Sequence, residues 1–254
     1  MIPEVTCVVR RISVFLALLL LFSAAALADP LTLQADLSGT VEVSLGNENG
    51  PKYVYSYAYP QVDAADPSAG LINEFYAYLV SDALDFEVPM MADYYASQGG
   101  DADVAVTVTY EITCNRDDFF SVLLCTEGND FLTYKGHTFS RADLKPGSSV
   151  ALPYLLGILA TDESDTWLQD RQTAKADDLV RSLVWEMLES RREELGIYPD
   201  LDRELFDLTF YPEEDFYLDE TGNPVFYLEP GAAADAAQGL LRFPLTLWEI
   251  LDEL

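Results

Sequence analysis

The chain has 254 residues, of which 44 are Asp or Glu and 14 are Lys or Arg, and its formal net charge is −30. A surface this acidic repels phosphate backbones and anionic lipid headgroups, which argues against nucleic-acid binding and against peripheral membrane binding. It attracts cations instead, including basic peptides and basic proteins, although solubility outside the cell would by itself account for the charge.

The first 28 residues have the pattern of an export signal. Two arginines precede an uncharged, mostly apolar run over 12–28, which ends in Ala-Leu-Ala. Signal peptidases cleave after small-x-small endings of this kind. We therefore expect a signal peptide over 1–28 and a secreted or cell-envelope protein. The alternative is an uncleaved anchor, because the run lies at the short limit for spanning a bilayer, and no later stretch is long and apolar enough to span one.

The strand predicted at 52–59 carries a row of tyrosines. Apolar and polar residues alternate at 40–45 and again at 52–59, with turn residues between, which predicts a hairpin. Four tyrosines recur at every second position and share one face: Tyr53, Tyr55, Tyr57 and Tyr59. Each ring combines an apolar body with a polar tip, so together they could form a binding platform for sugars or for a protein partner. The alternative is that they pack beneath a helix as part of the core.

A helix and a second hairpin follow. Asp66 and Pro67 have the pattern of a helix start, and apolar residues continue at helical spacing until Pro89 kinks or ends the helix. Strands rich in Val, Thr, Tyr and Phe are then predicted at 104–114 and 119–126.

Two cysteines lie on this second hairpin. If Cys114 pairs with Phe119 across a four-residue loop, Cys125 pairs with Val108, six residues further along the strand. At ~3.3 Å per residue the two thiols lie about 20 Å apart. A disulfide needs a Cα separation of roughly 4.4–6.8 Å. We therefore expect two free, buried thiols.

The C-terminal half adds a long helix, a hairpin and a closing strand with a short helix. Amphipathic spacing predicts a helix over 173–195, with Gly196 where a C-cap glycine belongs. A hairpin joins 215–218 to 225–228, and the closing elements lie in 241–254. Strands and helices are grouped, not strictly alternating, which predicts an α+β fold in which an antiparallel sheet packs against two long amphipathic helices.

Two stretches together resemble a family of bacterial envelope domains. The segment Tyr57-Ala-Tyr-Pro-Gln-Val, followed by Gly70-Leu-Ile-Asn-Glu-Phe, resembles the N-terminal region of PdaC-type peptidoglycan deacetylases. The segment 215–231, followed by Leu241-Arg-Phe-Pro-Leu, resembles the C-terminal half of the RsiV-like extracellular domain. The resemblance implies an RsiV ectodomain-like α+β fold, with a PdaC-like subdomain at 29–140 and an RsiV-like subdomain at 141–254.

The resemblance also implies a function. In RsiV-type anti-sigma factors the domain senses lysozyme by binding it, and in PdaC-type proteins it precedes a separate catalytic domain. We therefore expect a non-catalytic envelope binding or sensing module whose partner is lysozyme, another basic protein or cell-wall glycan. The family's Gly-Gly-Ala-His stretch is degenerate here, as Tyr134-Lys-Gly-His137, so no role is carried over to His137.

Motifs for catalysis and cofactor binding are missing from the sequence. His137 is the only histidine, and no serine lies in a Gly-x-Ser-x-Gly elbow. Without a His-Glu-x-x-His motif or a phosphate-binding glycine loop, we expect no metal and no cofactor. Carboxylates are so numerous that a cell-wall-associated hydrolase using acidic residues is the alternative function. The densest acidic clusters lie at 101–103, 162–165 and 213–215.

Overall fold

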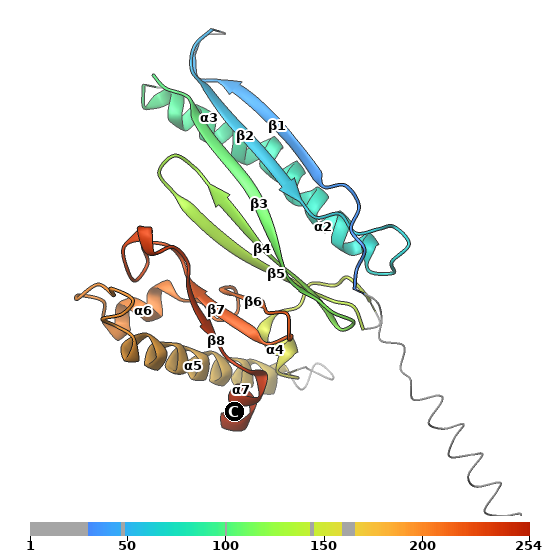
Figure 1. Cartoon of the computed structure of the whole chain (residues 1–254), viewed down its shortest axis with the longest axis vertical. Coiled ribbons are helices and arrows are strands. Elements are labelled where there is room, and N and C mark those ends of the chain that lie inside the picture. Colours follow the sequence, from blue (N-terminus) through green and yellow to red (C-terminus); the bar gives the residue numbers. More distant parts are fainter. Residues whose placement is uncertain (1–29, 47–48, 100, 143–144, 159–165) are drawn as a thin grey trace, which may run out of the picture. The chain divides into compact units, whose positions relative to one another are not determined.

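Eight strands form two sheets in the part of the chain that the structure describes. The computed structural model describes residues 30–46, 49–99, 101–142, 145–158 and 166–254, and the predicted leader lies outside them (Figure 1). The strand orders are β1-β2-β3-β4-β5 and β6-β7-β8. The fold is therefore mixed α+β, and Leu31–Leu254 form one compact unit. None of the described helices is long and apolar enough to cross a membrane.

The first sheet combines a hairpin with a three-stranded meander. Its strands are β1 (Leu37–Ser44), β2 (Lys52–Tyr59), β3 (Val104–Asn115), β4 (Phe119–Glu127) and β5 (Leu132–Ser140). Neighbours are antiparallel except β2 and β3, which are parallel. A parallel pair needs a crossover connection, and the helical segment between β2 and β3 supplies it. The prediction of one antiparallel sheet was therefore wrong in two respects: the strands divide between two sheets, and one pair is parallel.

A continuous helical segment crosses over one face of this sheet. It consists of α2 (Ala69–Asp82), a π-helical turn η1 (Ala83–Glu87) and α3 (Val88–Ser97). Near its start, Asp66 accepts a hydrogen bond from the backbone N–H of Ser68 at 2.8 Å. Pro89 is the second residue of α3, which begins directly after the π-helical turn. The helix therefore continues past the proline to Ser97.

Strand β4 is buried on both faces and joins the two halves of the fold. Its even-numbered residues, such as Phe120 and Val122, belong to the core beneath α2. On the other face Ser121 accepts a hydrogen bond from the backbone N–H of Leu218, at 3.0 Å. The next strand also approaches the second sheet closely, because a Cβ added at Gly136 would lie 1.9 Å from the carbonyl oxygen of Phe216.

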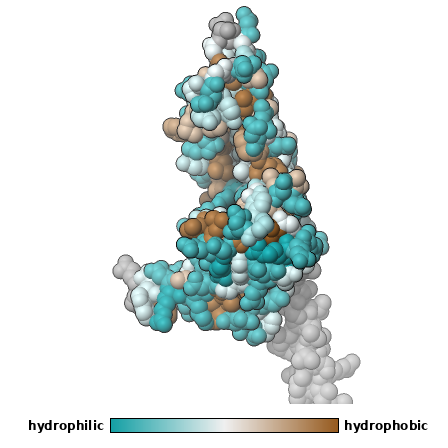
Figure 2. Space-filling view, turned by 90° about the vertical axis from the view of Figure 1, so that its left-hand side faces the viewer, coloured by the Kyte–Doolittle hydropathy of each residue, from teal (hydrophilic) through white to brown (hydrophobic). Residues whose placement is uncertain are grey.

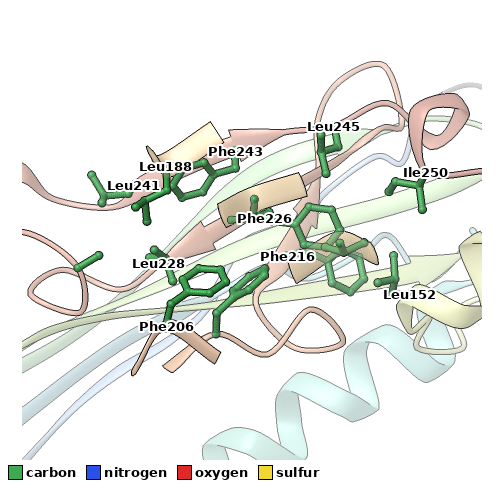
Figure 3. Close-up of a cluster of buried hydrophobic side chains, with 14 of the residues drawn as sticks. Leu152, Leu188, Phe206, Phe216, Phe226, Leu228, Leu241, Phe243, Leu245 and Ile250 are labelled. Carbon is green, nitrogen blue, oxygen red and sulfur yellow. The ribbon is translucent and has the colours of Figure 1, made fainter. Parts of the chain in front are cut away.

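The second sheet has its own helical cover. Its strands are β6 (Phe216–Leu218), β7 (Pro224–Leu228) and β8 (Leu241–Pro244). The accompanying helices are α4 (Leu152–Leu155), α5 (Thr166–Ser190), α6 (Arg203–Thr209), the 3₁₀ turn η2 (Ala236–Gln238) and α7 (Leu247–Glu253). Buried side chains from the sheet and from α4, α5, α6 and α7 converge on one core, in which Phe206, Phe226 and Phe243 are fully enclosed (Figure 3).

The predicted elements of the C-terminal half are present, with shifted bounds. The long helix begins at Thr166 and ends at Ser190, so it starts and stops earlier than the predicted 173–195. Gly196 has a left-handed φ of +62°, as expected of a glycine that ends a helical region. The hairpin and the closing strand and helix lie where the sequence predicted them. The division at 140/141 stays a prediction.

The register of the β3–β4 hairpin differs from the prediction. Cys125 lies opposite Thr109, and a β-bulge between Ile112 and Cys114 moves Cys114 opposite Ser121. A bulge adds a residue to one strand and turns the next side chain to the other face. Cys114 thereby enters the core of the second half. Ser121 is four positions from Cys125, about 13 Å along the strand. Both thiols are free, as predicted, but only Cys114 is buried, whereas Cys125 is half-buried.

Candidate functional site

The four predicted binding tyrosines differ in their surroundings. Tyr53, Tyr55 and Tyr59 are buried in the core beneath the helical segment, where the Tyr59 ring centroid lies 5.6 Å from that of Tyr76. Tyr57 is half-buried, and its ring leans over Gly39, where an added Cβ would lie 2.7 Å from the hydroxyl. The face as a whole therefore packs as core and does not form a flat, open platform. A role of the tyrosines in binding stays a prediction.

Three of these tyrosines also line a cavity of about 350 Å³ between the sheet and the helical segment. Tyr53, Tyr55 and Tyr59 line it from β2, and Val106 and Val108 from the parallel neighbour β3. Tyr57 does not take part. The side chains that enclose it from the helix and from the β4–β5 loop are Glu87, Val88, Met90, Met91 and Phe131. We call this cavity the tyrosine pocket.

The tyrosine pocket has a buried interior and an exposed rim. Tyr53 and Tyr55 are at most 5% exposed, whereas Met90 is 62% exposed and Phe131 is 37% exposed. Glu87 is the exposed carboxylate of the rim. It is the last residue of the π-helical turn, and such turns change which side chains a helix directs toward its neighbour. The pocket therefore presents aromatic rings inside and a negative charge at its edge.

The phenols of the pocket are held in their neutral form. Burial is the main cause that raises the pKa values of Tyr53, Tyr55 and Tyr59. The negative charge of Glu87 adds to the rise at each of the three, which places the carboxylate within electrostatic reach of all three hydroxyls. Neutral rings beside one carboxylate favour a cationic ligand over an anionic one.

The helical segment around the pocket exposes apolar residues and carries acidic ones. Its largest exposed apolar side chains are Tyr78, Phe86, Met90 and Tyr94. Its five charged residues are all acidic: Glu74, Asp82, Asp85, Glu87 and Asp93. Figure 2 shows one face of the molecule, on which hydrophilic residues predominate and apolar residues gather in separate patches. A helix that is both apolar and acidic on its exposed side suits a partner that is apolar and basic.

A pair of carboxylates forms a second candidate site. Asp177 of α5 and Glu213 line a cavity of about 460 Å³ together with Pro153, Thr173 and others. Burial, followed by the charge of Glu213, raises the pKa of Asp177 to about 6. Glu213 belongs to the acidic cluster that the sequence shows at 213–215. No sequence pattern singled out Asp177. Spacing alone could not reveal this pair, because the partners lie on distant segments.

The single histidine is packed against aromatic rings. His137 lies in β5 opposite Val122, and its ring centroid is 4.8 Å from that of Phe75. Burial and the charge of Lys135 lower its pKa to about 4. Its Nδ1 atom is buried and has no hydrogen-bond partner among the described residues. These surroundings are those of a neutral histidine packed against the aromatic core from a strand.

Comparisons with known proteins support the fold of the chain and indicate no activity. No family model and no curated protein matches the sequence. A solved member of the DUF3298 family from Bacteroides fragilis is 12% identical, with 89% of this chain and 94% of that chain aligned at a TM-score of 0.52. A DUF3298 family protein from Pseudomonas aeruginosa is 11% identical over 88% and 94% of the two chains, at a TM-score of 0.46. The structural neighbours are thus DUF3298 proteins, and at these identities the likeness is one of fold alone.

Proposed function

We propose that this protein is an exported, non-catalytic binding module of the cell envelope that recognises a basic protein, with lysozyme as the first candidate. The observation that carries the proposal is the tyrosine pocket, whose neutral rings adjoin the Glu87 carboxylate. The helical segment that encloses it has no basic residue, and the whole chain has a net charge of −30. A basic partner is therefore attracted at long range and can be held at short range by aromatic and carboxylate contacts.

Cell-wall glycan is the other ligand class for such a module. Sugars stack on broad aromatic faces at the surface, whereas Tyr53, Tyr55 and Tyr59 are at most 5% exposed and line a cavity that suits a narrow side chain better than a sugar ring. The rim offers few flat faces, since Met90 and Glu87 border it on the helix side. A basic protein is therefore the better match to the charge and the shape of this site.

Surface plasmon resonance against a lysozyme at several salt concentrations tests the proposal. A charge of this size steers a basic partner, and the Debye length shrinks from ~30 Å at 0.01 M salt to ~8 Å at 0.15 M. We expect the association rate to fall by about 10-fold or more over that range, with a smaller change in the dissociation rate. Equal binding to another basic protein of similar charge, or no binding at low salt, would refute recognition of lysozyme.

A hydrolase that uses carboxylates is the second candidate function. The raised pKa of Asp177, next to Glu213 in a cavity, is what a general acid in a carboxylate pair requires. Turnover of peptidoglycan fragments is the measurement that separates the two functions. Release of soluble fragments that is abolished by Asp177→Asn would establish the hydrolase and refute the non-catalytic module.

A further inference from the structure

We infer that the tyrosine pocket is a binding site for an organic cation on an apolar stem, namely the side chain of a lysine or arginine presented by the partner. The inference rests on the proposed function for the identity of the partner. The chemistry of the site is argued from its own residues, because three phenol rings, two methionines and one carboxylate line the same cavity.

The shape of the pocket fits a side chain and not a globular surface. Its volume of about 350 Å³ exceeds that of one amino-acid side chain, and its interior is bounded by Tyr55, Val106 and Val108. A lysine or arginine stem is apolar along three or four methylene groups and charged at the end. Inserted past the exposed rim, the stem would contact the valines and methionines, and the charged head would reach the phenol rings.

The electrostatics of the pocket select for positive charge. Cations are attracted to the faces of aromatic rings within about 6 Å, and the attraction grows when the ring and the cation are desolvated. Glu87 adds a full negative charge that already acts on Tyr53, Tyr55 and Tyr59. Among the residues that the structure describes, no Lys or Arg lines the cavity to compete for that carboxylate. A neutral stem of the same length would gain the apolar contacts but neither of the charge interactions.

The methionines provide a direct readout of occupancy. The sequence has four, of which Met90 and Met91 line the pocket and Met187 packs against the separate core of the second half. The full chain labelled at the methionine methyl groups is titrated with Nα-acetyl-lysine methylamide, with the corresponding arginine derivative, and with the neutral Nα-acetyl-norleucine methylamide. We expect saturable shifts of the Met90 and Met91 methyl resonances with the two cations, and an at least 5-fold weaker effect with norleucine.

Two variants with the same change in charge test the role of Glu87. Glu87→Gln removes the rim carboxylate, whereas Asp85→Asn removes a charge two residues earlier on the same turn, and Asp85 does not line the pocket. We expect Glu87→Gln to weaken cation binding at least 5-fold and Asp85→Asn to weaken it less than 2-fold. Equal effects of the two variants, equal binding of norleucine, or equal shifts at Met187 would overturn the assignment.

The same measurements distinguish failure of the site from failure of the proposed function. Saturable methionine shifts with the small cations, together with no binding of a basic protein, would refute the proposed function and keep the site. Binding of a basic protein without any shift at Met90 and Met91, in the protein complex or with the small cations, would refute the site and keep the function.

Discussion

The two largest hydrophobic cores among the described residues differ in their aromatic residues. The core of the second half contains phenylalanines that are at most 4% exposed, among them Phe206, Phe216 and Phe226 (Figure 3). The core beneath α2 and α3 contains buried tyrosines, and three of them, Tyr53, Tyr55 and Tyr59, also line an open cavity. A buried phenol is favoured by a polar partner or by access to water, which a phenylalanine does not require. Tyr76 of the same core is an exception, because its buried hydroxyl has no hydrogen-bond partner among the described residues.

The core of the second half therefore stabilises the fold alone, whereas the core beneath α2 and α3 also contains the tyrosine pocket. The phenylalanine rings in the core of the second half carry no polar atom, so they can pack densely without burying an unpaired polar group. Where the rings carry hydroxyls, the helix that covers them includes a π-helical turn, an exposed carboxylate at Glu87 and an exposed Met90 at the rim. The substitutions below are chosen to change one region and leave the other intact.

The largest expected effect lies where the two regions meet. Gly136→Ala would place a Cβ 1.9 Å from the backbone oxygen of Phe216, and a backbone atom of a packed sheet cannot yield as a side-chain tip can. We expect a loss of about 3 kcal/mol or more in the free energy of unfolding, measured by urea denaturation. Gly70→Ala in α2, where nothing lies within 4 Å, is the matched control and should cost nothing. Equal stability of the two variants would contradict the observed contact.

The next largest expected effect is at His137, whose ring packs against Phe75 and Tyr76 of α2. Its pKa is lowered from 6.5 to about 4 in the folded chain, so protonation favours the unfolded state. The stability that the neutral histidine contributes is therefore present above about pH 6.5 and is lost as the pH falls toward 4. Relative to His137→Gln, the wild type should lose about 2–3 kcal/mol between pH 7 and pH 4.

The comparison with His137→Gln isolates this contribution from that of the acidic groups. The raised pKa values of Asp177, Asp215 and Glu229 act in the opposite direction, because these groups bind protons more tightly in the folded chain. They are present in both proteins and cancel in the difference. Parallel curves of unfolding free energy against pH for the two proteins would contradict the burial of a neutral imidazole.

A reciprocal exchange of one hydroxyl tests the contrast between the cores. Phe226→Tyr adds a phenol oxygen to the fully enclosed core, where we expect a cost of about 1–3 kcal/mol for the unpaired polar group. Tyr55→Phe removes a hydroxyl from the pocket and should change stability by less than about 1 kcal/mol. Thermal unfolding of both variants measures the difference. Equal costs would mean that the two cores tolerate hydroxyls alike.

The parts of the fold that the sequence predicted are those set by local pattern. Alternation at 52–59 and helical spacing after Asp66 correspond to β2 and α2, and the hairpin of β6 and β7 lies at its predicted turn. Strand β5 was missed, and the parallel pairing of β2 with β3 was missed as well. Pairing between strands depends on tertiary contacts and on the path of the crossover, which no local period records.

The candidate site was predicted in part, for a similar reason. The tyrosine row was visible as a period of two, and three of its four members line the pocket. Glu87, Met90 and Phe131 were not predicted, because they come from a helix and a loop that only the fold brings to the same cavity. The β-bulge that reorients Cys114 was also beyond the sequence, since one inserted residue reverses the face of every side chain after it.

The most direct test of the central claim is the rate at which a basic protein leaves the variants Glu87→Gln and Asp85→Asn. Both lose one negative charge from the same helical turn, so long-range steering and the association rate with lysozyme should fall equally. A cationic side chain seated beside Glu87 predicts that the dissociation rate rises at least 5-fold in Glu87→Gln and less than 2-fold in Asp85→Asn. Identical dissociation rates for the two variants would contradict binding at the tyrosine pocket.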